Sequence, residues 1–163
     1  MRQHNRIKKK KSGKDPYAFA HTGYAWCATR AWYECTMGLI EHAILGSSDH
    51  HMAWLSVGDL KQSIHGKCHP SYVRRCKEWM DRSCHITNFE VGYVPGYITH
   101  YFHGSKKKRY YRERWEILID HGYNPDTDLF HNENGLIQLK NKPALEQAIK
   151  LYNRSRSEDS IDE

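Results

Sequence analysis

A pair of histidines, His100 and His103, is the first arrangement in the sequence whose residue types could do chemistry. Neutral imidazole nitrogens are good ligands for divalent metal ions. Residues three apart face opposite sides of a straight strand, so both rings reach one ion only if the chain turns between them. Gly104 is compatible with such a turn. The chain has 12 histidines, however, so the spacing also fits a chance pair without a metal.

Basic residues follow this pair. Lys106 and Arg109 belong to a group of six lysines and arginines within residues 106–114. Beside a bound metal, such cations can neutralise the charge that develops on a diphosphate leaving group. The alternative is an exposed helix face, because Glu113 and Glu116 lie in or next to the same stretch.

Asp49 is the candidate general base. It closes the sequence Gly46-Ser47-Ser48-Asp49, where we expect a helix to begin with a serine cap. The helix dipole stabilises an ionised carboxylate there, and an ionised carboxylate that lines a pocket can accept the proton of an attacking hydroxyl. The same position also suits a purely structural capping residue.

Two other patterns favour structural roles. Residues 65–69, with Cys76 and Cys84, suggest a zinc site, but seven residues separate consecutive cysteines. Paired zinc ligands are usually about two to four residues apart. The Asp-x-Asp pattern at 126–128 has the form of a metal–nucleotide site, but it follows Asn124-Pro125, so we expect a turn with capping bonds.

The elements that must position these residues are mostly helices. Apolar residues between Tyr72 and Met80 recur at helical spacing and predict one buried face. The sequence predicts helices over about 26–37, from 46–49 to Gly58, and over 70–83, 106–120 and 143–154, with strands at 89–94, 97–102 and 136–139. The expected fold class is therefore α+β, mostly helical with a short sheet.

Charge is distributed unevenly along the 163 residues. Residues 1–14 hold seven of the 25 lysines and arginines and no acid, so the remaining 18 bases nearly balance the 19 acids. We expect a disordered basic leader over 1–14, a single folded domain over 15–156 and an acidic tail over 157–163. The hydrophobic content of 39% excludes a collagen-like or fully disordered chain.

The apolar segments and the cysteines indicate the cellular compartment of the protein. No run reaches the ~18 apolar residues that cross a bilayer, and no apolar stretch of a secretory signal follows the basic N-terminus. Five cysteines, an odd number, fit free thiols in a reducing compartment. We therefore expect a cytoplasmic protein without a membrane span.

Three segments, taken in order, resemble a known family. They read TGYAWCATR at 22–30, ILGSSDHHM at 44–52 and YITHYFHGSKKKR at 97–109. The set is similar to the C-terminal, acceptor-side half of GT-A-fold glycosyltransferases, especially the galactosyltransferase-like proteins found among bacterial and phage sequences. The resemblance extends from about residue 17 to about residue 156.

This resemblance implies a metal-dependent sugar transfer from a nucleotide-sugar to a hydroxyl acceptor. It makes Asp49 the base that deprotonates the acceptor, and it makes His100 and His103 ligands of Mn²⁺ or Mg²⁺. The residues that it places beside the nucleotide-sugar donor are Gly23, Tyr24, Trp26, Lys106 and Arg109.

The resemblance does not extend to the nucleotide-binding half of such an enzyme. Residues 1–21 are too short and too basic to form that half, and no Asp-x-Asp lies upstream of Asp49. We therefore expect the chain to be incomplete and inactive on its own. Its partner would be a separate chain that carries the nucleotide-binding half, or a second copy.

Two alternatives stay open. The lysine run at 8–11, the basic run at 106–109 and an aromatic content of 12% fit a small nucleic-acid-binding protein. A phage accessory protein that acts by interaction, without catalysis, fits the same fold expectation.

Overall fold

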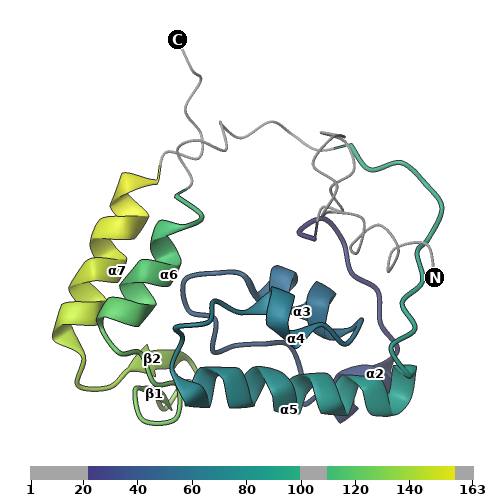
Figure 1. Cartoon of the computed structure of the whole chain (residues 1–163), viewed down its shortest axis with the longest axis horizontal. Coiled ribbons are helices and arrows are strands. Elements are labelled where there is room, and N and C mark those ends of the chain that lie inside the picture. The colour runs from purple at the N-terminus through teal and green to yellow at the C-terminus, as the bar shows by residue number, and fades with distance from the viewer. Residues whose placement is uncertain (1–21, 100–109, 157–163) are drawn as a thin grey trace. The chain divides into compact units, whose positions relative to one another are not determined.

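The computed structural model describes residues 22–99 and 110–156 and has an α+β fold (Figure 1). Its contacts divide the chain into two compact units. The first comprises residues up to Ile64 together with Arg74–Ile98, and the second comprises His65–Val73 and the chain from Thr99 onward. The predicted leader at 1–14 and the predicted tail at 157–163 lie outside the described residues.

The first unit is helical. It contains α2 (Arg30–Cys35), α3 (Ser48–Leu55), α4 (Leu60–Ser63) and most of α5 (Pro70–Thr87).

Two buried indoles form part of the core of this unit. The rings of Trp32 and Trp79 meet edge to face, with centroids 5.5 Å apart. Trp32 Nε1 donates to Ser83 Oγ at 3.0 Å, and Trp79 Nε1 donates to the carbonyl of Gly38 at 3.1 Å. Because both indole N–H groups have acceptors, these large rings are buried without leaving a donor unsatisfied.

The second unit combines the first turn of α5 with α6 (Glu113–Asp120), two short strands and α7 (Pro143–Ser155). The strands β1 (Leu129–His131) and β2 (Ile137–Leu139) are antiparallel, with Phe130 opposite Gln138. Helices α6 and α7 lie side by side (Figure 1). The buried apolar residues of this unit include Tyr72, Leu118, Tyr123, Leu145 and Tyr152.

Several predicted elements form with shifted ends. Helix α5 begins at Pro70 as predicted and continues to Thr87, beyond the predicted end at 83. Helix α7 begins at Pro143, where proline suits the first helical position. Helix α2 is shorter than predicted, because Thr29 caps it by accepting from the backbone N–H of Trp32 at 3.2 Å. Helix α6 likewise starts only at Glu113.

The predicted strand at 89–94 is wrong. These residues form no strand, and neither do residues 97–99, the described part of the other predicted strand. Phe89 and Val91 instead pack beside α3: Val91 contacts the buried pair Trp54 and Val57. The observed sheet pairs β2, which was predicted, with β1, which was not. Local β propensity marked the tyrosine- and valine-rich segment, but a strand also needs a pairing partner.

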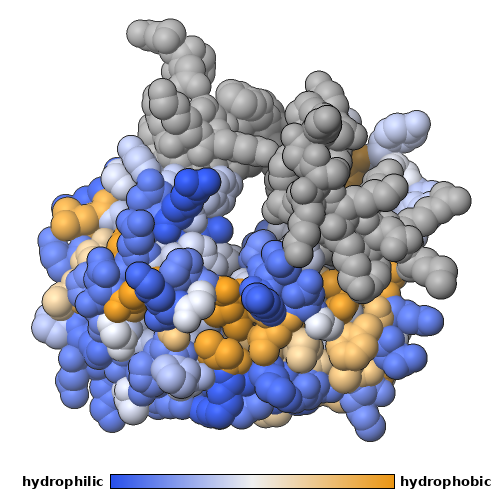
Figure 2. Space-filling model, in the orientation of Figure 1, coloured by the Kyte–Doolittle hydropathy of each residue, from blue (hydrophilic) through white to orange (hydrophobic). Residues whose placement is uncertain are grey.

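Apolar side chains also reach the surface. On the face shown in Figure 2, hydrophobic atoms form small patches between hydrophilic ones. The most exposed large apolar side chains include Met37, Val94 and Tyr97. No helix in the described part of the chain is long and apolar enough to cross a bilayer.

Candidate functional site

Asp49 lies in the first turn of α3 and is half-buried. Its Oδ2 accepts a hydrogen bond of 2.8 Å from Oγ1 of Thr22, a residue 27 positions earlier in the chain. This predicted base is therefore oriented by a contact that the sequence pattern did not identify.

The segment after Thr22 folds back on itself. Trp26 Nε1 donates to the carbonyl oxygen of Thr22 at 2.8 Å. Trp26 remains 41% exposed and Tyr24 51% exposed, and Gly23 lies between Thr22 and Tyr24 with its surface accessible. One residue, Thr22, thus contacts both the predicted base and a predicted substrate-binding residue. Three of the five predicted substrate-binding residues belong to this segment.

The turn before α3 has an unusual backbone. Gly46 and Ser47 both have left-handed conformations, with φ of +90° and +81°. Such a conformation is unfavourable for serine. Ser47 stands at the N-cap position without a side-chain cap bond, and its buried Oγ has no hydrogen-bond partner among the described residues. Ser48 Oγ donates to the carbonyl of Ile40 at 2.8 Å instead. The predicted serine cap is therefore wrong, and contacts from outside the helix fix its start.

His51, within helix α3, has a structural role. His51 is fully buried, and its Nδ1 lies 2.7 Å from Oγ of Ser63, which is also buried. This hydrogen bond joins α3 to α4. The ring of His50 packs edge to face on Trp54 within α3. These contacts hold the helix that carries Asp49, and sequence spacing alone gave no signal for them.

The other predicted site residues are not described by the structure. His100, His103, Lys106 and Arg109 all lie between the described ranges 22–99 and 110–156. Within those ranges, no group of three or more histidine, cysteine, aspartate or glutamate side chains could hold a metal ion.

In the histidine- and cysteine-containing loop at 65–69, both histidine rings accept hydrogen bonds from nearby backbone N–H groups. His65 Nδ1 accepts from the backbone N–H of Lys67, and His69 Nδ1 accepts from that of Ser71. Burial raises the pKa of Cys68 to about 11, so its thiol is protonated near neutral pH.

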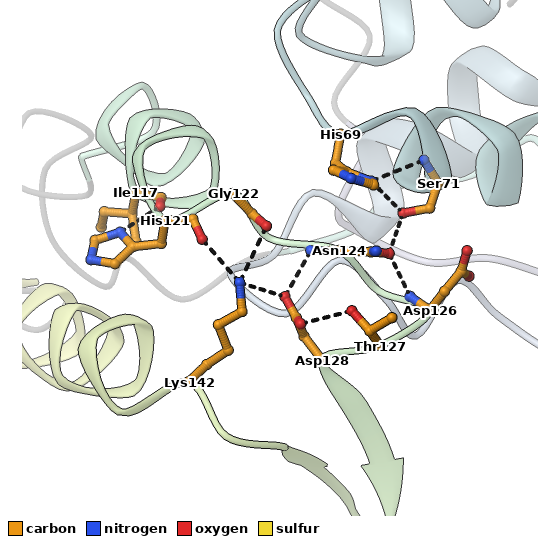
Figure 3. A network of polar contacts seen from close by, with 10 residues as sticks. All are labelled: His69, Ser71, Ile117, His121, Gly122, Asn124, Asp126, Thr127, Asp128 and Lys142. Carbon is orange, nitrogen blue, oxygen red and sulfur yellow. Dashed lines mark hydrogen bonds and ion pairs between the residues drawn. The ribbon is translucent and has the colours of Figure 1, made fainter.

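The Asp-x-Asp pattern at 126–128 forms the predicted turn (Figure 3). Asn124 Oδ1 accepts from the backbone N–H of Asp126, and the carbonyl of Asn124 accepts from the backbone N–H groups of Thr127 and Asp128. The same Oδ1 accepts from Ser71 Oγ at 2.6 Å, which ties the turn to the first turn of α5.

Asp128 is buried at the centre of a second part of this network. It accepts from the backbone N–H of Asn124 and from Thr127 Oγ1, and it pairs with Lys142 Nζ at 3.2 Å (Figure 3). Burial raises the pKa of Asp128, but these hydrogen bonds and the ammonium charge outweigh burial and lower the pKa overall. Because all of its partners belong to the fold, Asp128 has a structural role.

Some helical charges of the described residues form ion pairs one turn apart. On α5, Arg74 pairs with Glu78 at 2.7 Å and Lys77 with Asp81 at 2.6 Å. The basic runs at 8–11 and 106–109 lie outside the described ranges.

Comparisons of the chain with protein-family models, curated proteins and solved structures found no match.

Proposed function

We propose that this chain is a glycosyltransferase-like domain in which Asp49 is the general base for sugar transfer from a nucleotide-sugar to a hydroxyl acceptor. The observation that supports this function is the Thr22–Asp49 hydrogen bond. It places an oriented, half-exposed carboxylate beside the segment that contains Gly23, Tyr24 and Trp26. The ordered motifs in the sequence, which resemble the acceptor-side half of such transferases, are the second support.

The reaction needs one proton acceptor. In the proposed step, the acceptor hydroxyl oxygen forms a bond to the anomeric carbon while the bond from that carbon to the diphosphate oxygen breaks. The leaving diphosphate takes the bonding electron pair, and the hydroxyl proton passes to Asp49. Thr22 donates to Oδ2, and the proposal assigns the proton to Oδ1. Direct displacement by a single base inverts the anomeric configuration.

The proposal also assigns roles to residues that the structure does not describe. His100 and His103 would hold Mn²⁺ or Mg²⁺, and Lys106 and Arg109 would face the diphosphate. The described residues form no metal site by themselves, so only the proton transfer to Asp49 is assigned to described atoms. A separate chain carrying the nucleotide-binding half would complete the enzyme.

A sensitive transfer assay tests the role of Asp49. The purified chain is incubated with radiolabelled uridine diphosphate sugars, Mn²⁺ and simple saccharides, beside an Asp49→Asn variant. We expect slow transfer at most, and Asn should reduce it further by about 10²–10⁴-fold because it cannot accept the proton. Transfer that Asp49→Asn leaves unchanged would contradict the role of this residue. Rapid transfer by the chain alone would contradict its incompleteness.

A further inference from the structure

Trp26 combines exposure with a fixed orientation. Its indole N–H donates to the carbonyl of Thr22 at 2.8 Å, while 41% of the residue stays accessible. The other described indoles of the first unit are at most 8% exposed. An anchored aromatic ring loses little conformational entropy when a ligand stacks on it. The exposed part of Trp26 is therefore suited to binding rather than to core packing.

The surroundings of Trp26 favour a neutral polar ligand. Residues 22–29 contain no charged side chain, and the guanidinium that follows, Arg30, is paired with Glu34 at 2.7 Å. The charged group joined to the segment through Thr22 is the carboxylate of Asp49. A carboxylate repels phosphates and accepts hydrogen bonds from hydroxyls. Residues 22–29 therefore supply no cation of their own to a diphosphate.

We propose that Trp26 binds a pyranose ring of the acceptor, which makes the acceptor a saccharide. This inference rests on the proposed function and changes one expectation from the sequence, because it moves Trp26 from the nucleotide-sugar donor to the acceptor sugar. The C–H face of the pyranose packs on the indole, and a hydroxyl at its edge reaches Asp49. Tyr24, 51% exposed and two residues away, adds a second aromatic ring to the same segment.

Nuclear magnetic resonance of the ¹⁵N-labelled full chain tests this site. The indole N–H signal of Trp26 is assigned by its loss in Trp26→Phe. The probes are the methyl glycosides of galactose, glucose and N-acetylglucosamine, and uridine diphosphate without metal. At least one glycoside should shift the Trp26 signal saturably, and uridine diphosphate should not. Affinity should fall by about tenfold or more in Trp26→Ala, the usual effect of removing a central tryptophan.

Two variants control for indirect effects. Trp26→Phe keeps an aromatic face but loses the indole N–H anchor, so its affinity should lie between that of the native chain and that of Trp26→Ala, which separates stacking from the Thr22 contact. Tyr33→Ala removes an aromatic residue of similar exposure, 50%, from α2 and should leave affinity unchanged.

Absence of a glycoside-induced shift, or a shift with uridine diphosphate alone, would overturn the inference. Donor binding with Mn²⁺ but no glycoside binding would overturn it while leaving the proposed function intact. Glycoside binding without donor binding would support the inference and contradict the proposed function.

Discussion

The Asp49 carboxylate is held by a hydroxyl that is distant in the chain. Thr22 and Asp49 are 27 residues apart, and their 2.8 Å hydrogen bond depends on how the segment before α2 returns to the start of α3. Asp49 could be predicted as a candidate because glycine, two serines and an acid mark a helix start. Thr22 could not, because no local pattern encodes a contact between two separated segments.

A double-mutant cycle measures how much the Thr22–Asp49 hydrogen bond contributes to the free energy of unfolding. Thr22→Val and Asp49→Ala each remove one partner, and the free energy of unfolding is measured by urea for both single variants and the double variant. Thr22→Val should destabilise the chain by about 1–2 kcal/mol, since the lost hydrogen bond involves a charged acceptor in a half-buried place. The two effects should be coupled by about 1 kcal/mol. Strict additivity would show that the contact contributes no stability.

Asp128 gives the second unit a pH dependence. Its folded pKa is lowered, so its ionised form stabilises the fold above the unfolded pKa near 3.8. That contribution is lost as pH falls through the folded value. The stability difference between the native chain and Asp128→Asn should therefore be large at pH 6 and shrink below about pH 4.

Urea unfolding at pH 6 and at pH 3 checks this dependence. Glu133→Gln, an exposed change in the turn between β1 and β2, should leave stability unchanged at both values. A difference for Asp128→Asn that stays constant across this range would contradict a structural role for the ionised carboxylate.

At the scale of elements, the longer helices and strand β2 were predictable, whereas α4, β1 and the pairing of the two strands were not. Helices α5 and α7 carry their signals locally: an apolar stripe on α5 and a proline at the first position of each. The residues at 89–94 have strong β propensity, yet Phe89 and Val91 lie beside α3 and form no strand. A strand depends on a partner elsewhere in the chain, which propensity does not report.

The junction between α3 and α4 depends on Gly58. This residue has a φ of +76°, and an added Cβ would lie 3.2 Å from the Phe89 ring. Gly58→Ala should therefore lower the free energy of unfolding by about 1–3 kcal/mol, through backbone strain and displacement of the ring. Gly66→Ala is the matched control, because nothing lies within 4 Å of its added Cβ. Equal stability of the two variants in urea would contradict this account.

At the scale of the whole molecule, the α+β class and the helical content followed from the sequence, while the division into two compact units did not. Local patterns do not reveal where long-range contacts become sparse, and the single domain expected over 15–156 stays a prediction. The candidate site was predicted in part. The structure joins Asp49 and Trp26 through Thr22, whereas His100, His103, Lys106 and Arg109 remain predictions from the motif order.

Calorimetric titration of the purified chain with a uridine diphosphate sugar in the presence of Mn²⁺ tests the glycosyltransferase proposal most directly. The native chain, Asp49→Asn and the double variant His100→Ala/His103→Ala are compared. Saturable, metal-dependent binding that Asp49→Asn retains and the histidine variant loses is the predicted result. Absence of donor binding by the native chain at any Mn²⁺ concentration would contradict the proposal and favour a non-catalytic interaction domain.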